Sequence, residues 1–133
     1  MGVLVRGKPR PTEVLCVREV RAEMPAERVA QVRDFYTRLL RLEPWPDGAQ
    51  IPGCLGLGSQ QRGLLLQVRH DPIIDPVRIR VRLLVDGLDE LRQRLDQQPW
   101  PYEFLHGLGW TERRMLLHDP AGNLIEVRES LAI

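Results

Sequence analysis

The chain has 133 residues, which is enough for one domain with a hydrophobic core and too few for two ordinary domains. The 19 Lys and Arg against 18 Asp and Glu give a net charge of +1, and aromatic residues make up only 5%, which argues against a nucleic-acid-binding surface. No apolar run is long enough to span a bilayer, and the two cysteines, Cys16 and Cys54, are too few for a disulfide framework, so we expect a cytoplasmic protein.

The first half of the chain predicts a tail, a strand, a helix and two further strands. Residues 1–12 contain glycines, a lysine and two prolines, which favour a flexible tail. Residues 14–24 (VLCVREVRAEM) mix apolar residues with alternating charges, so we expect a strand with Glu19 and Arg21 on its charged face. Apolar residues at helical spacing then predict an amphipathic helix over 26–42, and CLGLGSQ and RGLLLQVRH predict two short strands.

The second half repeats this order. VRIRVRLLV (77–85) alternates strictly, with Arg80 and Arg82 on one face, and DGLDELRQRLDQQ (86–98) predicts a helix with Asp86 as its N-cap. YEFLHGLG, RRMLLH and NLIEVRES predict three more strands, and DPAGN supplies the last hairpin turn. The chain therefore consists of a strand, a helix and about three strands, written twice. Because the first strand of each half is charged on one face, we expect two curved sheets to enclose a polar cavity.

Three stretches carry a resemblance to a known family: RDFYTRLLRLEPW (33–45), RLLVDGLDELRQRL (82–95) and RRMLLHDPAGNLIEV (113–127). They resemble the vicinal-oxygen-chelate superfamily, which includes glyoxalase I, bleomycin-resistance proteins and extradiol dioxygenases. Arg41 stands where that superfamily usually has glycine. The resemblance implies an α+β fold in which two tandem βαβββ modules, at about 13–74 and 75–133, form a curved mixed sheet around a cup-shaped cavity within one domain.

Metal-dependent members of the superfamily hold a divalent ion at four inward positions, usually His, Glu, His and Glu. The resemblance carries these positions to Glu19, Gln67, Arg80 and Glu126. A guanidinium has no lone pair to donate, and its fixed charge opposes a divalent cation. We therefore expect no metal here, and expect Arg80 to form an ion pair with Glu126 in a charged cup.

The first interpretation is a metal-free protein that binds a small molecule, with the arginines holding an anionic group of it, or that lacks present catalytic activity. Its candidate binding residues are Glu19, Arg21, Gln67, Arg80, Arg82, Trp110 and Glu126, with Trp110 either a stacking wall or a loop anchor. The alternative is a lyase or dioxygenase that binds Ni, Zn, Mn or Fe through Glu19, Gln67 and Glu126 while Arg80 swings aside. A third interpretation is an interaction module, and a homodimer fits all three. The residues alone do not identify a ligand or decide whether the protein is an enzyme.

Overall fold

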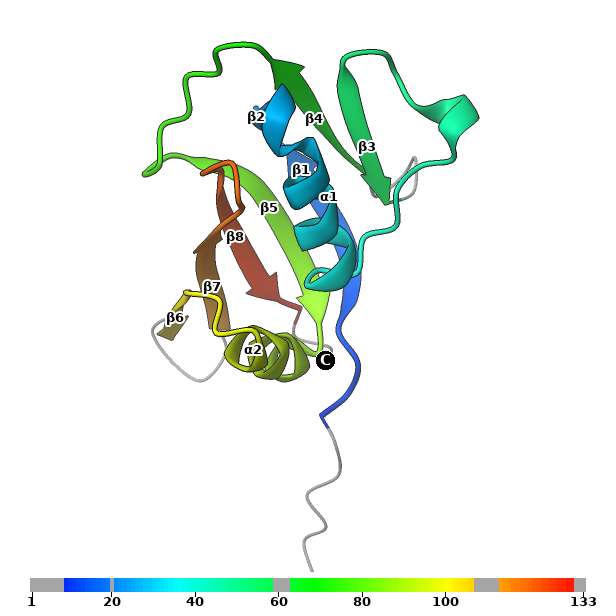
Figure 1. Cartoon of the computed structure of the whole chain (residues 1–133). Helices are drawn as coiled ribbons and strands as arrows, with labels where there is room; N and C mark the ends of the chain where they lie inside the picture. Colours follow the sequence, from blue (N-terminus) through cyan, green and yellow to red (C-terminus); the bar gives the residue numbers. More distant parts are fainter. Residues whose placement is uncertain (1–8, 20, 59–62, 107–112, 131–133) are drawn as a thin grey trace, which may run out of the picture.

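The structure is a computed structural model that describes residues 9–19, 21–58, 63–106 and 113–130, with Glu19 described by its backbone alone. Within these ranges the first half forms β1 (Glu13–Glu19), β2 (Glu23–Pro25), α1 (Val29–Arg38), β3 (Cys54–Gly58) and β4 (Gly63–Arg69). The second half forms β5 (Ile79–Asp86), α2 (Leu88–Gln97), β6 (Glu103–His106), β7 (Arg113–His118) and β8 (Leu124–Glu129). Figure 1 shows the arrangement, and the predicted α+β class is confirmed.

The strands form two mixed sheets. Five strands pair in the order β1-β5-β8-β7-β6, and three pair in the order β2-β4-β3. The β5–β8 and β2–β4 pairs are parallel, and the other pairs are antiparallel. The strand predicted over 14–24 is thus divided: β1 joins the sheet of the second half and β2 joins the sheet of the first half. The two halves of the chain share a strand-pairing interface as a result.

The core lies between the helices and the two sheets, and includes residues of β2, β3 and β4 as well as of the five-stranded sheet. Helix α1 buries Val32, Phe35 and Tyr36, and α2 buries Leu88, Leu91 and Leu95 at helical spacing. They cluster with alternate residues of the central strands, which are Val81, Leu83, Val85, Met115, Leu117, Ile125 and Val127. Since side chains alternate along a strand, the intervening residues of β5, β7 and β8 belong to the opposite face of the sheet.

The exit from α1 is fixed by a close contact between Trp45 and Gly56. The Trp45 N–H donates to the Gly56 carbonyl at 3.0 Å, and a Cβ on Gly56 would lie 2.1 Å from the Trp45 ring. The Gln50 side chain completes the contact, accepting from the Gly56 N–H at 2.8 Å and donating to the Trp45 carbonyl at 2.9 Å. Only glycine fits on β3 at this point.

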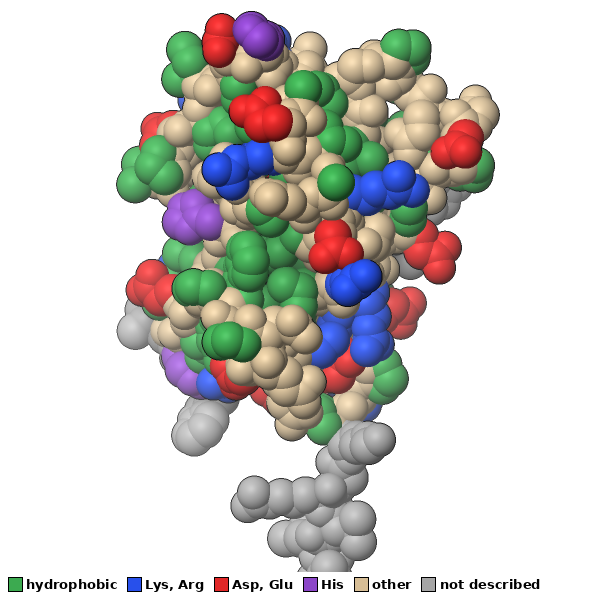
Figure 2. Space-filling model, viewed as in Figure 1, with side chains coloured by type: hydrophobic (Ala, Val, Ile, Leu, Met, Phe, Trp, Pro, Cys, Tyr) green, Lys and Arg blue, Asp and Glu red, His purple; other side chains and the backbone are tan. Residues whose placement is uncertain are grey.

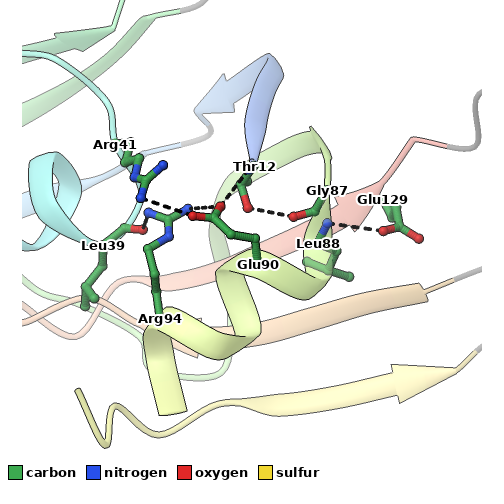
Figure 3. Close-up of polar contacts among 8 residues, drawn as sticks. All are labelled: Thr12, Leu39, Arg41, Gly87, Leu88, Glu90, Arg94 and Glu129. Atoms are coloured by element: carbon green, nitrogen blue, oxygen red, sulfur yellow. Dashed lines mark hydrogen bonds and ion pairs between the residues drawn. The ribbon is translucent and has the colours of Figure 1, made fainter. Parts of the chain in front are cut away.

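Glu90 of α2 joins three segments of the chain (Figure 3). Its Oε2 accepts from the Thr12 N–H at 2.6 Å and lies 3.2 Å from Arg94 Nη2, and its Oε1 lies 3.1 Å from Arg41 Nη2. Arg94 also donates to the carbonyl of Leu39. One carboxylate therefore holds together the segment before β1, the end of α1 and the first turns of α2.

A second buried network links the two halves through the turn between β7 and β8. The Tyr36 hydroxyl donates to Asp119 Oδ2 at 2.7 Å, and Asn123 Nδ2 donates to the same oxygen at 2.9 Å. Asp119 Oδ1 accepts from the N–H groups of Ala121 and Asn123. Asn123 also bonds both backbone groups of Glu23, accepting from its N–H and donating to its carbonyl. Burial raises the pKa of Asp119, against the lowering effect of these hydrogen bonds.

Candidate functional site

Arginines gather on the face of the five-stranded sheet that the helices leave uncovered. Arg18 of β1 lies directly opposite Arg82 of β5, and Arg82 is in register with Glu126 of β8. Arg128 of β8 lies opposite Arg114 of β7. Residues directly opposite each other in a sheet share a face. We call these five residues, four arginines and one glutamate, the arginine face. Glu103 of β6 lies on the same side of the sheet, because it is opposite Leu116, which is itself opposite Glu126.

Glu126 is the one buried charge of the arginine face, with a side chain 7% exposed. Its Oε1 lies 3.7 Å from Arg82 Nε, and its Oε2 lies 3.3 Å from Arg114 Nη1. Both arginines remain about half exposed, at 52% and 50%. A single carboxylate is therefore shared by two guanidinium groups, each of which keeps donors directed to solvent.

Arg80 does not take part in this pairing. The register between β5 and β8 shifts between Ile79 and Val81, so Arg80 lies at a bulge. Its side chain is buried, and its Nη1 donates to the Arg21 carbonyl at 2.9 Å. Within the described part of the chain, its Nε has no hydrogen-bond partner. The predicted Arg80–Glu126 ion pair is therefore wrong: the bulge interrupts the strict alternation assumed from the sequence, and Arg82 and Arg114 take that role.

The other predicted site residues are dispersed. Arg21 is exposed and contributes its backbone carbonyl to Arg80. Gln67 belongs to β4 in the other sheet, where its Oε1 accepts from Arg69 Nη2 at 3.2 Å. Glu19 is in backbone register with Val81, and its side chain lies outside the described residues, as does the whole of Trp110. Of the predicted set, the structure brings Arg82 and Glu126 side by side.

The donor set does not fit a divalent metal. Within ranges 9–58, 63–106 and 113–130, apart from residue 20 and the side chain of Glu19, no three His, Cys, Asp or Glu side chains are gathered as a metal would require. Of the four predicted ligand positions, Arg80 has no lone pair, and Glu126 already lies against two cations. Gln67 is a neutral, weak donor whose oxygen is engaged by Arg69. Nothing in the described residues therefore supports a metal centre at this position.

Arg18 and Arg114 are the members of the arginine face that sequence reasoning missed. Arg114 reaches Glu126 diagonally, because Leu116, two residues further along β7, is the residue opposite Glu126. Arg18 comes opposite Arg82 after a register shift between Val14 and Cys16. The alternation of side chains within one strand does not determine which residue of the neighbouring strand lies opposite. The sequence therefore did not predict that Arg18 or Arg114 would belong to this face.

Neither a protein-family model nor a curated protein matches the sequence. Solved structures do match. A Bacillus anthracis protein assigned to the glyoxalase family has a TM-score of 0.70 and 20% identity, covering 98% of this chain and 100% of its own. The chain has a glyoxalase-like fold. Lactoylglutathione lyase from Agrobacterium tumefaciens matches with a TM-score of 0.59 and 22% identity, covering 85% of this chain and 93% of its own.

A third structure with the glyoxalase-like fold is TnmS3, an antibiotic binding protein from a Streptomyces species. It has a TM-score of 0.59 and 17% identity, covering 86% of this chain and 96% of its own. Glyoxalase, bleomycin-resistance and dioxygenase proteins recur among the matches, so the resemblance drawn from the sequence is confirmed at the level of the fold. In the described part of this chain no helix is long and apolar enough to cross a membrane.

Proposed function

We propose that the chain is a metal-independent member of the vicinal-oxygen-chelate superfamily that binds a small anionic molecule on the arginine face. The observation that carries the proposal is the clustering of arginines around a buried carboxylate. Four arginines lie together there, and the carboxylate among them, Glu126, is buried between Arg82 and Arg114. The exposed edges of the Arg82 and Arg114 guanidinium groups remain as donors for an anion.

The chemistry of arginine suits this role. A guanidinium stays charged at any working pH and offers a planar fork that matches the two oxygens of a carboxylate or phosphate. Glu126 lies against the two central arginines and leaves them about half exposed. One fold neighbour is an antibiotic binding protein, which supports a binding role, and another is a lyase, which represents the metal-dependent alternative. The described donor set favours binding without metal.

The test is a titration of the full chain with inorganic phosphate and with citrate, followed by thermal unfolding. We expect citrate to raise the Tm, and we expect the double variant Arg82→Gln/Arg114→Gln to lose most of that rise. The matched control is Arg33→Gln/Arg78→Gln, which removes the same charge at two exposed positions that do not belong to the arginine face. Equal loss of the effect in the control, or no effect in the wild type, would count against the proposal.

Metal dependence is tested separately by elemental analysis of protein purified without chelator, with Ni, Zn, Mn or Fe added back. We expect no stoichiometric metal. A metal bound at one equivalent and lost in Glu126→Ala would overturn metal independence and favour the lyase or dioxygenase alternative. Because this readout does not use an anion, it is independent of the citrate titration.

We further infer a cytoplasmic homodimer. The connector between β4 and β5 exposes Ile73 and Val77, at 88% and 82%, and such apolar residues are commonly covered by a partner. Cys16 and Cys54 are both free thiols, as suits a reducing compartment. Light scattering should give twice the chain mass, and Ile73→Ser/Val77→Ser should shift the protein towards monomer. A wild-type monomer at micromolar concentration would refute the dimer.

A further inference from the structure

A cavity of about 800 Å³ lies between α1 and α2, on the side of the sheet opposite the arginine face. Its size is within the range of small-molecule sites, which is about 300 to 1,000 Å³. Helix α1, the residues after α2 and the turn between β7 and β8 form its walls. In Figure 2, hydrophobic side chains gather at the centre of this face, and Arg side chains lie above them and to their right, next to Asp and Glu side chains. None of the residues assigned to the proposed anion site lines it.

The floor of the cavity is apolar and partly aromatic. It is formed by Phe35, Leu39 and Trp100. The rings of Phe35 and Trp100 are tilted at 43° with centroids 5.0 Å apart. The indole N–H of Trp100 donates to the His118 carbonyl at 3.0 Å, which fixes the ring and leaves its apolar surface to the cavity. A flat hydrocarbon body is the group that such a floor accommodates best.

The walls of the cavity carry three arginines and two aspartates. Arg28, Arg38 and Arg94 line the cavity against Asp34 and Asp119. Both oxygens of Asp119 are already bonded within the β7–β8 turn. Asp34 pairs with Arg38 at 2.7 Å, an exposed ion pair of the kind that contributes little. The side of the cavity towards solvent is therefore suited to an anionic group.

We propose that this cavity is a second ligand site, for a small aromatic carboxylate. The aromatic body lies on Phe35, Leu39 and Trp100. The carboxylate accepts from the guanidinium groups of Arg28 and Arg38, which are on exposed positions and can turn towards it. Arg94 is held in place by Glu90 and by the Leu39 carbonyl, so it contributes a fixed positive charge to the wall.

The experiment is a titration of the ¹⁵N-labelled full chain with 1-naphthoate and with its neutral analogue 1-naphthamide, followed by NMR. We expect naphthoate to shift the amide resonances of α1 and of residues 94–100, and to bind about tenfold more tightly than naphthamide. The variant Arg28→Gln/Arg38→Gln should lose most of that preference while still binding both compounds. Arg33→Gln/Arg78→Gln is the matched control and should keep the preference.

The variant Arg82→Gln/Arg114→Gln separates the two sites, because it should leave naphthoate binding unchanged. Shifts confined to β5, β7 and β8 would overturn the proposal, since the carboxylate would then occupy the arginine face. Retention of the preference in Arg28→Gln/Arg38→Gln, its loss in the control, or no binding at millimolar naphthoate would also overturn it.

Discussion

Arg41 and Glu90 form an ion pair in which Arg41 Nη2 lies 3.1 Å from Glu90 Oε1, and Arg41 has a left-handed backbone with φ of 55°. Among the described residues, it is the only non-glycine with positive φ. The superfamily that the sequence resembles usually has glycine at this position. Arg41 therefore adopts a left-handed backbone conformation that glycine adopts more easily. Its side chain binds Glu90, the carboxylate that links the end of α1 to α2.

Two variants separate the strain at position 41 from the ion pair. Arg41→Gln removes the ion pair and keeps the strained conformation, whereas Arg41→Gly removes both. We expect Arg41→Gly to be more stable than Arg41→Gln by about 1 kcal/mol in urea unfolding. Equal stabilities would mean that position 41 is not strained.

Glu90 predicts a specific dependence of stability on pH. Burial acts to raise its pKa, but the hydrogen bonds from Thr12 and the charges of Arg94 and Arg41 outweigh burial and lower it from its ordinary value of 4.5. Because the folded-state pKa is lowered, the stability that Glu90 contributes is present above about pH 4.5 and is lost as the pH falls through the folded value.

Urea unfolding of the wild type and Glu90→Gln between pH 3 and pH 7 measures this contribution. The variant should be less stable at pH 7, and the difference should shrink below about pH 4.5. Asp119 is present in both proteins, so its contribution cancels when the two free energies of unfolding are subtracted. A difference that stays constant over this range would contradict the assignment.

Asn123 satisfies buried backbone groups on the other half of the chain. Asn123→Ala leaves the N–H and carbonyl of Glu23 without these partners and removes a donor to Asp119. We expect it to lower the free energy of unfolding by about 2 to 4 kcal/mol in urea. Gln93→Ala, at an exposed position of α2, is the control and should change stability by less than about 0.5 kcal/mol.

The contact between Gly56 and Trp45 predicts an asymmetry between two glycine substitutions. In Gly56→Ala the new methyl group meets the Trp45 ring, so we expect a loss of about 1 to 3 kcal/mol in thermal or urea unfolding. Gly48→Ala meets nothing within 4 Å and has no positive φ, so it should be nearly neutral. Similar losses in both variants would show that Trp45 moves aside without cost.

The variant Glu126→Gln is expected to strengthen anion binding and, if Glu126 were a metal ligand, to weaken metal binding. If the arginine face binds anions, removing the competing carboxylate should raise the affinity for citrate by about threefold or more, measured by calorimetry. If Glu126 were a metal ligand, the same change would abolish metal binding. A fall in citrate affinity in this variant would contradict the role given to the arginines.

Much of the fold could be predicted from the sequence because its patterns are local. Leu88, Leu91 and Leu95 lie at helical spacing, and the DPAGN turn contains residues that accept tight-turn geometry, so α2 and the β7–β8 hairpin were both expected. The division of the first strand into β1 and β2 was not expected, because the pattern over 14–24 continues through the break. The strand is divided because β1 pairs with β5 and β2 pairs with β4, and these pairings outweigh the local pattern.

The site was less predictable because it depends on register. Glu126 was identified as a site residue, but its partners lie on β5 and β7, more than ten residues away in sequence. In β5 it is Arg82 that is in register with Glu126, whereas Arg80 lies at a bulge and donates to the Arg21 carbonyl, so Arg82 and not Arg80 is the partner of Glu126. Bulges leave no dependable signature in a single sequence.

The exchange of β1 has a consequence for the whole chain. The sequence repeat divides near residue 75, yet β1 hydrogen-bonds to β5, and Asn123 binds the backbone of Glu23 across the same division. If the first half unfolded, β5 would lose its pairing with β1. If the second half unfolded, the Glu23 backbone would lose its hydrogen bonds to Asn123. The boundary visible in the sequence is therefore crossed by strand pairing and by a buried hydrogen bond, so we expect the duplicated halves to melt as one cooperative unit.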